Sequence, residues 1–171
     1  MITITRLLIG GLFALMSLTA QAQTCSPNIQ KTKPDSQYEL LNNDTEVLDK
    51  KTGLIWQRCI LGASWNGSTC SGTATYHTWE DSFAQAATMA TNTGVAWRVP
   101  NIKELISLVE TACFLPAINE TIFPATPNFI WSSSFWSSSS AGRPFHFHHY
   151  DFEYNPWDKD YGLAVRLVRS Q

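Results

Sequence analysis

The chain has 171 residues, a formal net charge of −2 and only 15% charged residues. This balance excludes the dense basic surface with which proteins bind nucleic acid, so no nucleic-acid partner is expected. A hydrophobic content of 44% can fill the core of one domain, and 7 Trp, 9 Phe and 5 Tyr are a heavy aromatic load.

Residues 1–22 have the organisation of a secretory signal peptide. Arg6 precedes an apolar run over residues 7–18, and the segment ends in Ala20-Gln21-Ala22. The run is too short to cross a bilayer, and no later stretch is long enough either. The sequence therefore predicts a secreted or periplasmic protein that does not span the membrane. The predicted parts are a signal peptide (1–22), an extended N-terminal lead (23–37) and a folded domain (38–171).

Four cysteines follow the predicted signal peptide. An even number in an oxidising compartment predicts two disulfides, for which three pairings are possible. Locality favours Cys59 with Cys70, which leaves Cys25 to pair with Cys113. The spacings fit no zinc pattern of the CxxC type, and two disulfides would leave no thiol to act as a nucleophile.

A β-hairpin is predicted over residues 47–56. The apolar pair Val47 and Leu48 precedes a polar turn, which ends at Gly53 and is followed by Leu54, Ile55 and Trp56. Glycine supplies the positive φ that a short hairpin loop requires.

Two helices are predicted. The first begins at a Thr78 cap and ends at Asn92-Thr93-Gly94, with one apolar face made of Trp79, Phe83, Ala86, Ala87 and Ala90. The second follows the sequence WRVP. Asn101 caps it, Glu104 completes a capping box, and its buried stripe consists of Ile102, Leu105, Leu108 and Val109.

Arg98 and Glu104 have two interpretations. A guanidinium and a carboxylate could act as an anion clamp and an acid, but no general-base partner lies in a recognisable pattern. We favour structural roles for this block, namely for Trp97, Arg98, Pro100, Asn101 and Glu104.

The last third of the chain is predicted to be β structure. The segments FIWSSSFW, RPFHFHHYDF and GLAVRLVRS are short, strand-like and separated by Ser, Gly and Pro, as in an antiparallel sheet. In the last segment, one face would carry Leu163, Val165 and Leu167, and the other Ala164, Arg166 and Val168.

Six blocks together resemble the Lcl C-terminal domain family, named after the C-terminal domain of a bacterial collagen-like adhesin. The resemblance covers about residues 40–169, and the blocks are VLDKKTGLIWQRC, YHTWEDSFAQA, WRVPNIKELISLVE, PAINETIFP, IWSSS and AVRLVRS. It implies an adhesive, surface-associated domain that binds sulfated glycosaminoglycans, for which Arg143, Lys159, Arg166 and Arg169 would be the basic contacts. No collagen-like Gly-X-Y region is present.

The block WRVPNIKEL is also similar to an element of C-type-lectin-like folds. That likeness implies an α+β fold with a C-type-lectin-like arrangement, in which two helices pack on a twisted antiparallel sheet stapled by disulfides.

The stretch RPFHFHHYDFEY is a candidate metal site. On a strand, His146 and His148 share one face and could bind a metal such as zinc, with Asp151 or Glu153 completing the ligand set. The alternative, which we favour, is a hairpin with Phe145 and Phe147 in the core and the imidazoles in water. The acids from Asp151 to Asp160 similarly suit either a calcium loop or, as we favour, a solvated loop.

Several aromatic residues lie in polar contexts: Trp65, Phe135, Trp136, Tyr154 and Trp157. Aromatic rings beside hydroxyl and amide groups are typical of sugar-binding surfaces, although a loop Trp more often fills the core. The candidate ligand-binding set consists of Trp136, Arg143, His146, His148, Tyr154 and Trp157.

The sequence thus favours an exported binding module for a glycan, another surface polymer or a protein partner, with no cofactor and no catalytic residue. One alternative is a metal-dependent enzyme that uses His146, His148 and a nearby acid. Another is a structural component of a secreted assembly.

Overall fold

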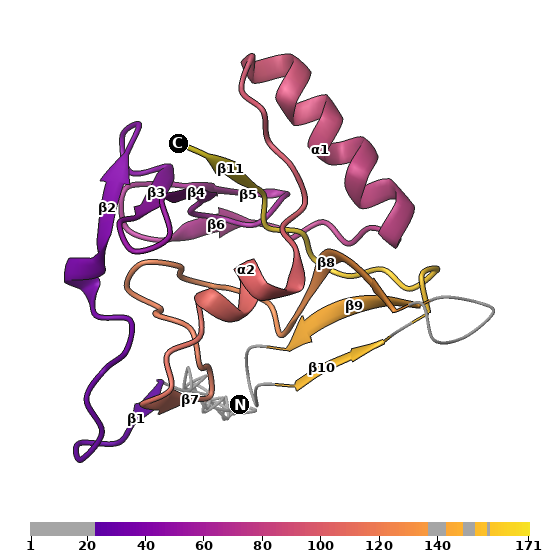
Figure 1. The fold of residues 1–171 in the computed structure, drawn as a ribbon. Coiled ribbons are helices and arrows are strands. Elements are labelled where there is room, and N and C mark those ends of the chain that lie inside the picture. The colour runs from indigo at the N-terminus through magenta and orange to yellow at the C-terminus, as the bar shows by residue number, and fades with distance from the viewer. Residues whose placement is uncertain (1–22, 137–142, 149–152, 157) are drawn as a thin grey trace, which may run out of the picture.

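The computed structural model describes residues 23–136, 143–148, 153–156 and 158–171, so the predicted signal peptide lies outside the described residues. In chain order the elements are β1 (Thr24–Cys25), the 3₁₀ helix η1 (Asp35–Gln37), β2 (Tyr38–Leu41), β3 (Glu46–Asp49), β4 (Leu54–Gln57), β5 (Ala63–Trp65), β6 (Cys70–Gly72), α1 (Trp79–Thr93), α2 (Ile102–Ser107), β7 (Cys113–Phe114), β8 (Phe129–Trp136), β9 (Arg143–His148), β10 (Glu153–Pro156) and β11 (Val168–Ser170) (Figure 1).

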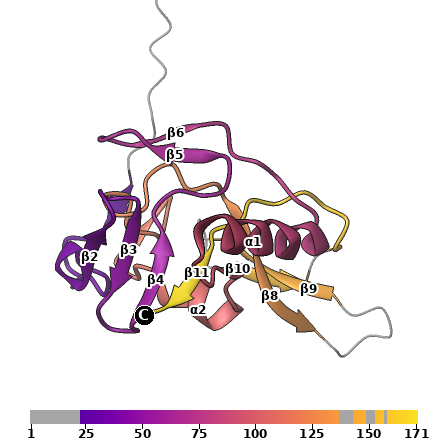
Figure 2. The ribbon, with the colours of Figure 1, turned by 90° about the horizontal axis from the view of Figure 1, so that it is seen from above.

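The strands form small antiparallel sheets. One has four strands in the order β11-β4-β3-β2, another has three in the order β10-β9-β8, and the pairs β1-β7 and β5-β6 are separate. The predicted mixture of two helices with antiparallel β structure is confirmed. The antiparallel strands are divided between separate sheets: β8, β9 and β10 form one, whereas the C-terminal strand β11 joins β4 in the other (Figure 2).

The predicted hairpin is present as β3 and β4. Gly53 has a φ of 71° at its turn, and the register pairs Glu46 with Gln57 and Leu48 with Ile55. Glu46 and Gln57 therefore lie side by side at the open end of this hairpin.

Two hydrophobic cores lie on opposite sides of β4. Because neighbouring strand residues point to opposite faces, Trp56 packs in a core with α2, whereas Ile55 packs in the core on the side of α1. Side chains of β8 alternate between the cores in the same way: Ile130 packs in the first and Trp131 in the second. Figure 1 shows α1 above and α2 below the level of β4 and β11.

Helix α1 begins and ends where the sequence predicts, with Thr78 as its N-cap and Gly94 as its C-cap. Its buried residues are Ser82 and Ala86, while Phe83 is 38% exposed and Ala87 is exposed. The apolar face predicted for this helix is therefore only partly the buried one. The Trp79 indole donates to the backbone oxygen of Ser132 at 2.8 Å, which attaches the first turn of the helix to β8.

Helix α2 has the predicted capping box. Asn101 accepts from the backbone of Glu104, and the Glu104 carboxylate accepts from the backbone of Asn101 and from the Arg98 guanidinium. Burial alone would raise the pKa of Glu104, but these hydrogen bonds outweigh it and hold the pKa below its ordinary value. Trp97 and Pro100 are buried beside this pair.

The N-terminal lead is attached to the domain along its length. Strand β1 pairs with β7, where the disulfide joins Cys25 to Cys113. The buried carboxylate of Glu110 accepts hydrogen bonds from the backbone of Thr32, Lys33 and Ala112. These contacts lower the pKa of Glu110 despite the opposing effect of burial.

The segment 163–168 is buried at every position. The predicted alternation therefore does not separate a core face from a solvent face, because both sides are covered. Arg166 is fully buried and donates to the backbone oxygens of Gln57 and Arg58 and to the Thr126 hydroxyl. Within the described residues, no helix is long and apolar enough to cross a membrane.

Candidate functional site

A cleft with a volume of about 460 Å³ lies between the β5–β6 hairpin, the base of the β3–β4 hairpin and the second half of α1. It is partly open to solvent. The side chains that give it chemical character are Glu46, Gln57, Trp65, Met89, Thr93 and Trp97. Its volume lies within the range of about 300–1,000 Å³ that is typical of small-molecule sites.

Trp65 provides an aromatic wall of the cleft, and Arg58 holds this ring in place. The central guanidinium carbon of Arg58 lies 3.4 Å from the centroid of the Trp65 ring. Arg58 covers one face of the ring and is not among the residues that line the cleft. The half-buried indole borders the cleft, where its uncovered surface can contact a ligand.

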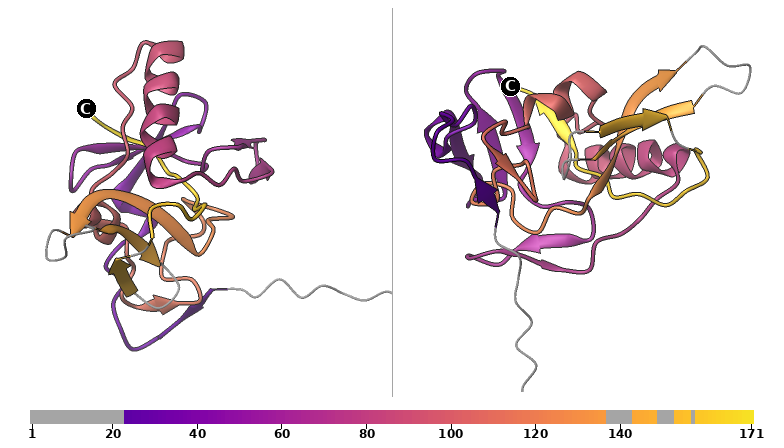
Figure 3. Two further views of the ribbon diagram at one scale, coloured as in Figure 1. Left: turned by 90° about the vertical axis from the view of Figure 1, so that its right-hand side faces the viewer. Right: turned by 90° about the horizontal axis from the view of Figure 1, so that it is seen from below.

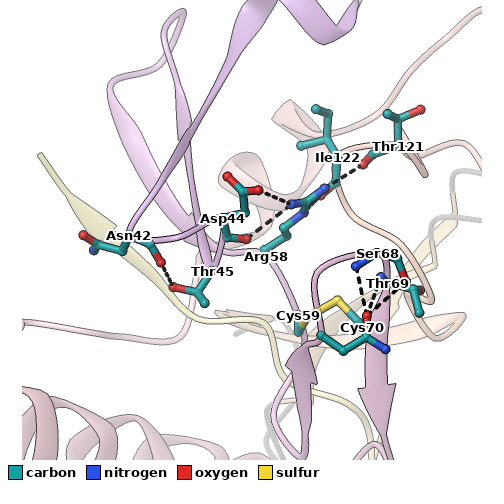
Figure 4. A network of polar contacts seen from close by, with 11 residues as sticks. Asn42, Asp44, Thr45, Arg58, Cys59, Ser68, Thr69, Cys70, Thr121 and Ile122 are labelled. Carbon is teal, nitrogen blue, oxygen red and sulfur yellow. Dashed lines mark hydrogen bonds and ion pairs between the residues drawn. A yellow bond between two sulfur atoms is a disulfide. The ribbon is translucent and has the colours of Figure 1, made fainter.

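Arg58 is itself fixed by three backbone oxygens. Its guanidinium donates to Ile122 at 3.1 Å, to Thr121 at 3.2 Å and to Asp44 at 3.4 Å, and the Asp44 carboxylate lies 4.0 Å away. Figure 4 shows it extending toward the 121–122 segment. Burial lowers the pKa of Arg58, while the Asp44 charge acts in the opposite direction. This network connects the aromatic wall to the body of the domain.

The β5–β6 hairpin that carries Trp65 projects from the edge of the domain (Figures 2 and 3). The disulfide between Cys59 and Cys70 ties β6 to the segment that follows β4 (Figure 4). Gly62 has a φ of 87°, and a Cβ at this position would collide with the backbone of Thr73 and Thr75. Only glycine lets the two sides approach this closely.

Across the cleft, Glu46 and Gln57 face each other on neighbouring strands. The Glu46 Oε2 atom accepts from the Arg169 guanidinium at 2.8 Å, and the carbon of this guanidinium lies 5.6 Å from the centroid of the Trp97 ring. Within the described part of the chain, Glu46 Oε1 and the Gln57 carboxamide have no hydrogen-bond partner. The cleft thus combines an aromatic wall with an acceptor and an amide.

Helix α1 closes the remaining side with Met89 and Thr93. Met89 adds apolar surface, while the Thr93 hydroxyl donates to the backbone oxygen of Met89 at 2.7 Å. An apolar wall with a few fixed polar groups can bind a small amphipathic ligand and fix its orientation.

The predicted histidine site is only partly described. His146 and His148 lie on β9, and both contact Phe129, with ring centroids 5.5 Å and 4.4 Å apart respectively. His146 is 2% exposed, so the expectation that the imidazoles lie in water is wrong for this residue. Asp151 lies outside the described residues, as does the side chain of Glu153, and the metal set stays a prediction. Among the described residues, no three His, Cys, Asp or Glu side chains gather as a metal site would require.

Most of the other predicted ligand contacts also lie outside the described side chains, namely Trp136, Arg143, Tyr154 and Trp157. Phe135, on β8, is 50% exposed and packs against Trp79 at 5.6 Å between ring centroids. It lies at the N-terminal end of α1, whereas the cleft lies toward the C-terminal end. Trp79 and Met89 are ten residues apart, or about 15 Å along the helix.

The predicted basic contacts for a sulfated polymer are largely engaged within the domain. Arg166 is fully buried, which lowers its pKa, and it cannot reach a polymer. Arg169 is paired with Glu46, and the exposed Lys159 lies 3.3 Å from Glu80. The expectation that Arg166 forms part of a polymer-binding surface is wrong.

A family model described as the Lcl C-terminal domain matches residues 45–169, which is most of the chain. The chain belongs to the Lcl C-terminal domain family. Every residue that lines the cleft falls within the matched range. Comparisons with curated proteins and with solved structures found no match.

In this Lcl C-terminal domain, β2 and the N-terminal lead precede the matched range yet pack onto it. The two disulfides, together with the family, are typical of a protein from an oxidising, extracytoplasmic compartment.

Sequence reasoning singled out Trp65 but missed its partners. Glu46, Gln57 and Met89 carry no local motif, since they stand at a hairpin base and on a helix. The one usable signal was the predicted turn at Gly53, whose register pairs Glu46 with Gln57. The placement of α1 across the cleft from the β5–β6 hairpin has no counterpart in local sequence.

Proposed function

We propose that this Lcl C-terminal domain is an exported, adhesive binding module that recognises a glycan through the cleft beside Trp65. The observation that carries the proposal is the indole itself. It is braced on one face by a buried guanidinium and borders a cleft that also contains Glu46 and Gln57.

The chemistry of sugars suits this arrangement. The C–H face of a pyranose ring packs on an indole, while its hydroxyls exchange hydrogen bonds with carboxylate and amide groups. A braced ring loses little conformational freedom on binding, so more of the interaction free energy appears as affinity.

We propose binding rather than catalysis for the cleft. Hydrolysis of a glycosidic bond usually requires two carboxyl groups, and among the described residues that line the cleft only Glu46 is an acid. The C-type-lectin-like arrangement and a surface location belong to the same proposal, supported by the likeness of WRVPNIKEL and by the adhesin for which the family is named.

A glycan array probed with the purified, oxidised protein tests the proposal. Trp65→Ala should lose binding to every glycan that the wild type retains, whereas Phe135→Ala, which removes an exposed ring at the N-terminal end of α1, should keep it. Binding that survives Trp65→Ala, or no binding to any glycan, would refute the proposal. Loss of binding in EDTA would instead indicate a metal-assisted site outside the cleft.

A further inference from the structure

We infer that the ligand of the cleft is an uncharged sugar, held by adjacent hydroxyl groups, rather than a sulfated or uronic acid-containing polymer. This inference rests on the proposed function and names the ligand class for the same site.

The charge of the cleft disfavours an anionic sugar. Of the described residues that line it, Glu46 alone is charged, and it is an acid. The two nearby cations are already bound within the domain. Arg58 donates to backbone oxygens, and Arg169 donates to Glu46 Oε2. A sulfate or carboxylate in the cleft would lie near a carboxylate without a dedicated cation.

The hydrogen-bonding groups of the cleft suit a pair of neighbouring hydroxyls. Glu46 and Gln57 are direct cross-strand neighbours, so their Cβ atoms lie about 5 Å apart on one face of the sheet. Glu46 Oε1 can accept a hydrogen bond, and the Gln57 carboxamide can both donate and accept. Two such groups side by side match two neighbouring hydroxyls, each of which is both donor and acceptor.

The position of Trp65 completes the pattern. It stands on the β5–β6 hairpin, on a different wall from the Glu46–Gln57 pair. A ring that stacks on the indole can direct the edge bearing its hydroxyls toward that pair. This geometry requires no charged substituent on the sugar.

Isothermal titration of the purified protein with matched neutral and sulfated forms of one oligosaccharide tests this inference. The array hit, or chitotriose and cellotriose if the array gives several, supplies the neutral form. We expect the neutral form to bind at least about tenfold more tightly than the sulfated form, a difference of about 1.4 kcal/mol. Raising the salt concentration should change the affinity of the neutral form little.

Two variants test whether Glu46 and Gln57 are responsible for the preference for the neutral sugar. Glu46→Gln should weaken binding of the neutral sugar and reduce its advantage over the sulfated form, because it removes the repelling charge. Gln57→Ala should weaken binding of both forms, and it leaves the ion pair of Glu46 with Arg169 intact. Glu39→Gln, a change at an exposed acid on β2 that does not line the cleft, is the matched control.

The results distinguish an error in the ligand class from an error in the location of the binding site. If the sulfated form binds more tightly and Trp65→Ala abolishes that binding, the ligand class is wrong while the cleft remains the binding site. If neither form depends on Trp65, the proposed function itself fails. Equal binding of both forms, unaffected by Glu46→Gln, would also overturn the inference.

Discussion

The Arg58 guanidinium stacks on the indole of Trp65 at 3.4 Å, and the same guanidinium donates to the backbone oxygens of Thr121 and Ile122. One buried side chain therefore links a projecting hairpin to a loop more than fifty residues away in sequence. The aromatic wall of the cleft depends on this link.

Replacing Arg58 should damage both stability and binding. Arg58→Ala leaves three backbone oxygens without their donor and removes the support behind Trp65, so we expect a loss of about 2–4 kcal/mol in the free energy of unfolding. Arg58→Lys keeps the charge but lacks the planar fork, and should restore stability only in part. Urea unfolding and sugar titration of both variants would check this. Unchanged stability in Arg58→Ala would contradict the linking role.

The two disulfides should have separable effects. In the chain-entropy account, loss of the link between Cys59 and Cys70, 11 residues apart, costs about 3 kcal/mol, and loss of the link between Cys25 and Cys113, 88 residues apart, about 4.5 kcal/mol. Only the first lies at the cleft. Paired Cys→Ser variants should therefore show that affinity falls when Cys59 and Cys70 are replaced and stays when Cys25 and Cys113 are. If affinity instead fell on replacing Cys25 and Cys113 and stayed on replacing Cys59 and Cys70, the cleft would not be the binding site.

Acid should destabilise the domain through Glu110. Its pKa is depressed in the folded state, so its stabilising contribution is fully present above its ordinary pKa of 4.5 and is lost as the pH falls through the folded-state value. Glu110→Gln should be less stable at pH 7 and should lose less stability between pH 5 and pH 3 than the wild type. Chemical unfolding at each pH measures this. Glu104 has a depressed pKa as well, so some acid sensitivity should remain in the variant.

Arg166 should matter for stability and not for contact with a polymer. Its guanidinium is bound by the backbone oxygens of Gln57 and Arg58 and lies 4.9 Å from the centroid of the Phe123 ring. Arg166→Met should lower the free energy of unfolding by about 3 kcal/mol or more, because several buried polar atoms lose their partner. Its glycan affinity, measured where the variant is still folded, should match that of the wild type. A selective loss of binding would contradict the buried role.

The sequence could predict features that local chemistry determines. The Asn101–Glu104 capping box, the Thr78 and Gly94 ends of α1 and the turn at Gly53 all follow from what one or two residues prefer in the backbone. The favoured cysteine pairing is the one present, since the shortest loop is the one closed.

What escaped sequence reasoning depends on which surfaces meet. The alternating pattern of residues 163–168 is typical of a strand with one solvent-exposed face, yet both of its faces are covered by other parts of the chain. Phe83 looks like a core residue but is 38% exposed, because α1 turns Ser82 and Ala86 toward the core instead. The cleft combines hairpin and helix residues between Thr45 and Trp97, so no local pattern reports it.

The most direct test of the account is a ¹H–¹⁵N correlation spectrum of the indole N–H groups during titration with a bound neutral oligosaccharide. The chain has 7 tryptophans, and a Trp65→Phe variant assigns the Trp65 signal by its disappearance. The account predicts that the Trp65 signal shifts with a saturable dependence on sugar concentration while the Trp79 signal, at the far end of α1, stays in place. A saturable shift of other indoles with an unmoved Trp65 signal would contradict it.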